Sequence, residues 1–166
     1  MSEQKGTFRR GIHPPDKKEL TKNEKIGVMP EVSDYYVNFS AHIGAPATPI
    51  VAAGDRVLEG QLIAKNNAKL GSNFFSPVAG VVVGIETRKT AVGGKADTIH
   101  IKAEGEGKVT LEPLSEKTKD SILRRIEEAG IIGLGGAGFP SHFKDMPKTP
   151  CDVLVINGAE CEPYLT

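Results

Sequence analysis

The chain has 166 residues, and its 21 basic and 21 acidic side chains cancel, which leaves no electrostatic basis for binding nucleic acid or an anionic membrane surface. Apolar residues make up 39% and charged residues 25%, as in an ordinary globular protein, and no apolar run approaches the ~20 residues of a membrane-spanning helix. Nineteen glycines and eleven prolines predict many turns and short strands.

Residues 1–34 are expected to form an extended arm. The segment is polar, rich in lysine and interrupted by proline, and residues 11–15, G-I-H-P-P, are typical of polyproline-like chain. Such a composition indicates a solvated arm, or one that crosses and packs on a neighbouring domain, rather than a ligand site.

Residues 35–110 are predicted to form a β domain. Ile99, His100 and Ile101 lie in an alternating segment in which the two isoleucines face the core and the histidine faces solvent. The three consecutive valines at 81–83 indicate the continuous apolar core of a strand.

Two turns in this domain have the order found in carrier domains. Residues 54–61, G-D-R-V-L-E-G-Q, predict a glycine-bounded hairpin with Val57 buried, and residues 76–80, S-P-V-A-G, predict a turn that leads into the valines. This order resembles the biotinyl/lipoyl carrier fold, a barrel-sandwich hybrid, and is similar to a segment of the A subunit of sodium-translocating NADH:quinone reductases. The resemblance implies a hairpin tip near Leu70. Lys69, one position away, lacks the residues that flank a modified carrier lysine, so a solvated loop lysine is the favoured interpretation and a covalent carrier domain is an alternative.

A second domain is expected over residues 111–166, and it begins with a helix over residues 115–129. Ser115 or Thr118 can cap this helix, and Gly130 is the expected stop. One apolar face is shared by Ile122, Leu123, Ile126 and Ala129.

The loop after the helix, residues 130–144, reads G-I-I-G-L-G-G-A-G-F-P-S-H-F-K. Its five glycines within nine residues would let a phosphate or a flat ring approach bare backbone N–H groups. Residues 133–138 match G-x-G-x-x-G, but the dinucleotide fingerprint needs a strand before it and a helix after it, whereas here a helix precedes and Phe139-Pro140 follows. No G-K-[ST] follows either, which excludes a Walker P-loop. The pattern favours a nucleotide- or flavin-sized ligand held outside a Rossmann arrangement.

Residues 151–156, C-D-V-L-V-I, predict a short buried strand of a parallel sheet. No other segment of the chain is suited to pair beside it, and the sequence stops at Thr166, where a second helix is expected. Our interpretation is that the α/β domain is incomplete in this sequence.

The segments G-L-G-G-A-G-F-P-S-H-F-K (133–144) and V-I-N-G-A-E-C-E-P-Y (155–164) resemble the C subunit of the Rnf electron-transport complex. The segment F-x-x-G-I-H-P-P (8–15) is similar to the start of those subunits. More distantly, the loop and the acidic segment are similar to the flavin-binding subunit of respiratory complex I, which has G-R-G-G-A-G-F-P-T-G-x-K and N-A-D-E-x-E-P. The resemblance implies a mainly β plus α/β chain, in which a barrel-sandwich hybrid domain precedes the start of an α/β flavin/NADH-binding domain.

The resemblance also implies a site for FMN and NAD(H). The glycines would present their backbone to the isoalloxazine ring and the ribityl chain. The lysine would face the FMN phosphate or a neighbouring polar atom, and the asparagine would form a hydrogen bond with the flavin. The phenylalanine would stack on the nicotinamide or adenine, and the glutamates would accept hydrogen bonds from a ribose or the nicotinamide amide. The implied cofactor-binding residues are Gly133, Gly135, Gly136, Gly138, Phe139, Lys144, Asn157, Glu160 and Glu162.

Three positions depart from the complex I pattern: Leu134 replaces an arginine, His142 a glycine and Ala159 an aspartate. Loss of the arginine and the aspartate removes two polar contacts, which would weaken FMN binding while still admitting NADH or a looser flavin. No catalytic side chain is assigned, because flavin chemistry belongs to the cofactor.

The implied function is that of a peripheral, cytoplasmic-side subunit of a membrane-bound ferredoxin:NAD oxidoreductase coupled to ion transport. It would contact other subunits of that complex and pass electrons between NADH, a flavin and iron–sulfur clusters. Cys151 and Cys161 are too few for a 4Fe-4S cluster, which takes four thiolates, so the clusters are expected beyond Thr166. The four histidines lack metal-ligand spacing, so no metal site is expected. A non-catalytic scaffold whose barrel docks other subunits is the main alternative.

Overall fold

The computed structural model describes residues 15–91, 93–134, 136–146, 149, 151–156, 158 and 162–165. These residues belong to two units. Glu31–Pro150 form the barrel unit, and Met1–Pro30 with Cys151–Thr166 form the terminal unit. Within the described ranges, no helix is long and apolar enough to cross a membrane.

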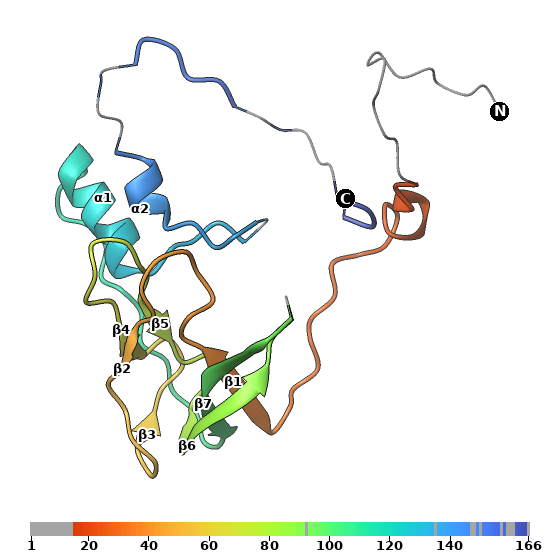
Figure 1. The fold of residues 1–166 in the computed structure, drawn as a ribbon, viewed down its shortest axis with the longest axis vertical. Helices are drawn as coiled ribbons and strands as arrows, with labels where there is room; N and C mark the ends of the chain where they lie inside the picture. Colours follow the sequence, from red (N-terminus) through yellow and green to blue (C-terminus); the bar gives the residue numbers. More distant parts are fainter. Residues whose placement is uncertain are drawn as a thin grey trace. The chain divides into compact units, whose positions relative to one another are not determined.

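The larger sheet of the barrel unit is antiparallel, with the strand order β1–β7–β6–β3. Its strands are β1 (Asp34–Asn38), β3 (Arg56–Val57), β6 (Gly80–Lys89) and β7 (Lys95–Ala103). The long hairpin of β6 and β7 dominates this sheet, with β1 added along the other edge of β7 (Figure 1). Ile99 and Ile101 are fully buried, as the alternating pattern predicts.

A smaller antiparallel sheet has the order β2–β4–β5. Its strands are β2 (Thr48–Pro49), β4 (Leu62–Lys65) and β5 (Phe74–Phe75). The core of the barrel unit consists of Ala47, Val57, Ile63, Ala64, Val82, Ile99 and Ile101. Each large aliphatic side chain among them contributes roughly 1.5–3 kcal/mol by leaving water, so strands as short as two residues are held in place by packing.

The hairpin predicted over residues 54–61 is not formed. β3 lies at the free edge of β6 instead, with Arg56 opposite Val81 and Val57 opposite Gly80. Val57 is buried as expected. Pairing with the long strand β6 satisfies backbone groups that a hairpin of so few residues would leave to solvent.

The three valines are not a continuous core either. A register shift between Val82 and Gly84 leaves Val83 as an extra residue in β6, and its side chain is 47% exposed, whereas Val82 is buried. An inserted residue of this kind bends the strand and increases its twist, which helps the hairpin to curve around the core.

The predicted helix is confirmed as α1 (Lys119–Glu128). Thr118 is its N-cap, and its hydroxyl accepts from the Ser121 amide in a capping box. Gly130 follows the helix with φ 65°, the left-handed conformation that ends many helices. A second helix, α2 (Ser141–Lys144), begins after Pro140, and both helices lie at one end of the barrel unit (Figure 1).

In the terminal unit, a 3-10 turn at Lys18–Leu20 lies beside the end of the chain. The Tyr164 amide donates to the Asp16 carbonyl at 2.8 Å, and the Thr21 hydroxyl donates to the Tyr164 carbonyl at 2.6 Å. The strand predicted over residues 151–156 is not formed. Its apolar side chains from position 153 to 156 are 77–84% exposed, because a strand forms only where a neighbouring backbone accepts its hydrogen bonds.

Candidate functional site

The glycine-rich loop after α1 closes on itself at its base. The Gly133 amide donates to the Phe139 carbonyl at 2.9 Å, and the Ser141 amide donates to the Ile131 carbonyl at 3.0 Å. Ile132 and Pro140 face each other in an antiparallel bridge between these bonds. The two ends of the loop are therefore tied together, and its tip lies between residues 133 and 139.

Gly138 fits against the barrel rather than against a ligand. Its φ is +67°, and a Cβ at this position would lie 2.5 Å from the Ala41 carbonyl oxygen and 2.8 Å from the Cα of His42. Its carbonyl accepts from the Ile43 amide at 3.2 Å. Gly130 is similarly constrained, since its Cβ would lie 2.3 Å from the Asn73 carbonyl oxygen. These two glycines allow backbone to approach backbone, which is a structural role.

Gly136 has the opposite surroundings. A Cβ there would meet no described atom within 4 Å, and Gly133 would meet only the Phe139 carbonyl oxygen, at 3.8 Å. Among the described residues, the backbone at Gly136 is therefore uncovered. Gly135, a further residue of the predicted site, lies outside the described residues.

A hollow of about 420 Å³ lies beside this open part of the loop. Its volume falls within the range of small-molecule sites. The described lining consists of Asn38, Ser40, Ala41, His42, Thr90, Ala91, Ala96, Gly136 and Ala137. The loop forms one side of the hollow, and the end of β1 with the β6–β7 hairpin forms the other.

A second hollow, of about 310 Å³, lies at another part of the barrel unit. Three glutamates line it: Glu31, Glu59 and Glu106. Carboxylates repel the phosphates of a nucleotide, so the hollow beside Gly136 is the better candidate for such a ligand.

His42 is a residue that the sequence did not single out. It is 9% exposed, its ring lies 5.3 Å from that of Phe74, and neither ring nitrogen makes a hydrogen bond within the described residues. Burial lowers the pKa of His42 below its ordinary value, which keeps the imidazole neutral. The backbone of Ala45 offsets part of this shift, although it makes no hydrogen bond of ordinary geometry with the ring. The short run A-H-I-G at 41–44 gave no pattern by which to recognise the residue.

Phe139 and Lys144 are not among the residues that line the hollow. The Phe139 side chain is 37% exposed and meets Phe143 edge to face, with 6.1 Å between ring centroids. Lys144 is exposed in the last turn of α2. His142 is buried, with Nε2 3.9 Å from Oε1 of Glu127, so it packs α2 against α1.

The remaining predicted site residues follow position 156. Asn157 and Glu160 lie outside the described residues, as do Ala159 and Cys161. Glu162 is described, and it belongs to the terminal unit, whereas the loop belongs to the barrel unit. The structure therefore gives geometry for the glycine-loop half of the predicted site.

Lys69, the candidate carrier lysine, lies in the loop between β4 and β5 and is exposed. The next residue, Leu70, contacts the segment that follows β1. The Ala45 amide donates to the Leu70 carbonyl at 3.2 Å, and a Cβ at Gly44 would lie 2.2 Å from that same oxygen. A modified carrier lysine needs a freely presented hairpin tip, so these contacts favour the solvated loop lysine.

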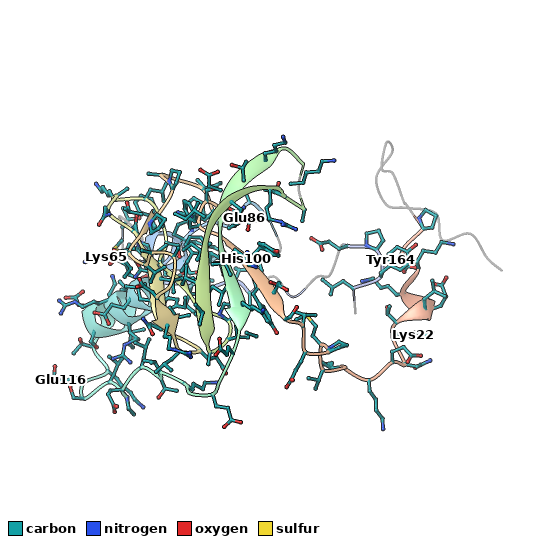
Figure 2. All side chains as sticks on the ribbon, turned by 90° about the horizontal axis from the view of Figure 1, so that it is seen from below. Lys22, Lys65, Glu86, His100, Glu116 and Tyr164 are labelled. Carbon is teal, nitrogen blue, oxygen red and sulfur yellow. The ribbon has the colours of Figure 1, made fainter. Side chains whose placement is uncertain are left out.

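An ionic cluster lies on the outer face of the larger sheet. The His100 ring contacts Asp34 at 2.7 Å through Nε2 and Glu86 at 2.8 Å through Nδ1, and Figure 2 shows Glu86 and His100 close together on this sheet. Tyr36 stacks on the imidazole with 4.4 Å between centroids, and the Arg88 guanidinium lies 3.8 Å from the centroid of the Tyr36 ring. The histidine predicted to face solvent is thus covered by neighbours.

These contacts shift two pKa values. The hydrogen bond to Asp34 raises the pKa of His100, burial opposes it, and Glu86 raises it further. The pKa of Asp34 is lowered, first by the Ser33 hydroxyl and then by His100. A protonated His100 therefore joins β1, β6 and β7 by charge-assisted hydrogen bonds.

Comparison with known proteins identifies two regions. Residues 6–106 match the family model of the RnfC barrel sandwich hybrid domain, and residues 126–166 match that of the Nuo51 FMN-binding domain. The first match confirms the predicted fold class of the β region. The second covers the glycine-rich loop and the acidic segment that suggested a flavin site.

The chain is also similar to the C subunits of several oxidoreductase complexes. It is 41% identical to that of the proton-translocating ferredoxin:NAD(+) oxidoreductase complex of Clostridium ljungdahlii, over 96% of this chain and 36% of that protein. It is 39% identical to the C subunit of the Na(+)-translocating ferredoxin:NAD(+) oxidoreductase complex of Acetobacterium woodii, over 100% of this chain and 39% of that protein. The C subunit of the ion-translocating oxidoreductase complex of Rhodobacter capsulatus is 41% identical, over 96% of this chain and 32% of that protein. The chain thus spans between 32% and 39% of the length of these relatives.

Proposed function

This chain belongs to the RnfC family, and on that premise we propose that it is a peripheral electron-transfer subunit of a membrane-bound, ion-translocating ferredoxin:NAD oxidoreductase. It would form part of a site for FMN and NADH, on the cytoplasmic side, and would reach the membrane through other subunits of the complex. Bound FMN would supply hydride acceptance from NADH and one-electron release. We place the boundary between the barrel-sandwich hybrid domain and the flavin domain near residue 110.

The observation that supports this proposal most directly is the open backbone at Gly136 beside a hollow of about 420 Å³. The loop lies in the segment that matches an FMN-binding domain. Barrel residues occupy the space beside Gly138, two positions later, so only part of the loop is available to a ligand. The roles that we propose for this chain are to bind and orient the ring system and to exclude water from one of its faces.

Iron–sulfur clusters are not assigned to Cys151 and Cys161. A four-iron cluster takes four thiolates, and the chain has two cysteines. Cys151 is exposed. We therefore propose that the clusters of the complex are held by other residues.

The test is binding of FMN and of NADH to the full-length protein. Gly136→Val should abolish flavin or nucleotide binding, because the added side chain fills the approach to bare backbone. Gly27→Val is the matched control, because a Cβ at Gly27 likewise meets no atom of the described residues within 4 Å and its φ lies outside the left-handed region, but Gly27 belongs to the terminal unit. Glu162→Gln should reduce NADH affinity by about 10- to 100-fold, the loss of one charged hydrogen bond, with little effect on melting.

The alternative function is a scaffold whose barrel docks other subunits and whose glycine loop is structural. The close packing of Gly138 and Gly130 on the barrel favours it for those two positions. Wild-type affinity for FMN and NADH in both Gly136→Val and Glu162→Gln, with wild-type melting, would show that the glycine loop and the acidic segment are structural. Failure of the wild-type full-length protein to bind FMN and NADH would support the scaffold.

A further inference from the structure

The barrel side of the hollow is built from small and uncharged side chains. The strand and hairpin residues that line it are Asn38, Ser40, Thr90, Ala91 and Ala96. The alanines leave a flat surface, and the amide and hydroxyl groups offer hydrogen bonds to the edge of a heterocycle. No cation lies among the described lining residues, so a phosphate would need a positive charge from just outside the hollow.

One arginine is paired across the sheet with a residue that lines the hollow. Arg88 is the cross-strand partner of Ala96, which lines the hollow, and the two side chains share one face of the sheet. The Arg88 guanidinium lies over the ring of Tyr36. Tyr36 is two residues before Asn38, so it too shares the face of a residue that lines the hollow.

Arg88 is available for an anion. Its partner Glu86 is 3.4 Å away, and the two side chains are 46% and 41% exposed. An ion pair so open to water is weak, and Glu86 also contacts His100. The Tyr36 ring holds the guanidinium in position, which lowers the entropy that would be lost on binding a phosphate.

We propose that the barrel forms one wall of the nucleotide site, with a planar heterocycle resting between Gly136–Ala137 and the β6–β7 hairpin, and with its phosphate bound by Arg88. This inference rests on the proposed function, because it takes the loop as a flavin or nucleotide site. It differs from the sequence-based expectation, which assigned the FMN phosphate to Lys144. The chemistry that the site recognises is a flat, uncharged ring joined to a phosphate, which FMN and NADH share.

The test compares ligands with and without the phosphate. FMN and riboflavin share the ring and ribityl chain, so the affinities of both are measured on the full-length protein and its variants, together with that of NADH. Arg88→Gln should lower the affinity for FMN about tenfold or more and leave that for riboflavin unchanged. Arg88→Lys, which retains the charge, should restore part of the loss. Arg56→Gln is the matched control, because Arg56 forms a similar exposed pair with Glu104 at 3.2 Å and is not among the lining residues.

A second variant tests the wall itself. Ala91→Leu extends an exposed hairpin side chain into the hollow and should weaken FMN and riboflavin equally, by about tenfold or more. Ala53→Leu, at an exposed turn outside the hollow, should have no effect.

The outcomes separate this inference from the function on which it rests. A loss in Arg88→Gln confined to FMN, or confined to NADH, supports the proposal and identifies which of the two occupies the hollow. Equal losses for FMN and riboflavin in Arg88→Gln would show that the arginine acts through Tyr36 and would overturn its phosphate role. Wild-type affinities in Ala91→Leu, with binding still abolished by Gly136→Val, would overturn the barrel wall and leave the proposed function intact. If the wild type binds none of the three ligands, the proposed function itself is wrong.

Discussion

Gly138→Ala tests the distinction between the structural and the open glycines of the loop. An alanine in the left-handed region costs about 1–2 kcal/mol, and the φ of Gly138 is +67°. The new Cβ would also lie 2.5 Å from the Ala41 carbonyl oxygen and 2.8 Å from the Cα of His42, and backbone atoms cannot rotate away. The loop must therefore move off the barrel, which breaks the hydrogen bond from the Ile43 amide to the Gly138 carbonyl, worth about 0.5–1.5 kcal/mol. We expect a total loss of about 1.5–3.5 kcal/mol in the free energy that holds the loop on the barrel.

The assay is urea unfolding together with hydrogen exchange of the Ile43 amide, which donates to Gly138. Gly138→Ala should lower the free energy of unfolding, or, where the loop opens separately, accelerate exchange at Ile43 by about tenfold or more. Gly136→Ala is the control, since its Cβ would meet no atom of the described residues within 4 Å, and its stability should stay within about 0.5 kcal/mol of wild type. Equal stability and equal Ile43 exchange in the two variants would refute the assignment of Gly138 to the barrel contact.

Two further predictions concern the sheet and the helix. The pKa of His100 is raised, so its contribution to stability should be complete below the ordinary histidine pKa of about 6.5 and should disappear as the pH rises through the raised value. The charged groups of this cluster are Asp34, Glu86 and Arg88, and His100→Gln should flatten the decline in the free energy of unfolding that urea unfolding shows as the pH rises above about 6.5. An unchanged pH profile in that variant would contradict the role of the cluster. Thr118→Ala should destabilise α1 by about 1 kcal/mol, because the capping box is lost, whereas Ser115→Ala should have no effect. The measurement is hydrogen exchange of the α1 amides, and equal exchange rates in the two variants would exclude the cap.

The local elements could be predicted because their signals act over a few residues. Ile99 and Ile101 alternate with polar neighbours, and burial of both in β7 follows from the two-residue period of a strand. Thr118 and Gly130 mark the ends of α1 through their own backbone chemistry. The family was likewise predicted correctly from two motifs, each contiguous in the chain.

Pairing between distant segments could not be predicted in this way. The glycines at 54 and 60 suggested a local hairpin, but β3 pairs with β6, because a free strand edge can accept any nearby backbone. The apolar run from Val153 to Ile156 has the composition of a buried strand, yet composition alone does not supply the neighbouring strand that its backbone requires.

The sequence by itself determined the residue types of the candidate site and the order of its two domains. Within the loop, however, the sequence does not show which glycines contact the barrel and which are open. Only the tertiary structure decided that Ala41 and His42, almost a hundred positions earlier, occupy the space beside the Gly138 Cα, whereas no described residue occupies the space beside Gly136. The same is true of Arg88, which the register of β6 and β7 pairs with Ala96, a residue that lines the hollow. The physical reason is that a ligand meets a surface, and a surface is made by whichever side chains the folded backbone brings together, regardless of their separation in the chain.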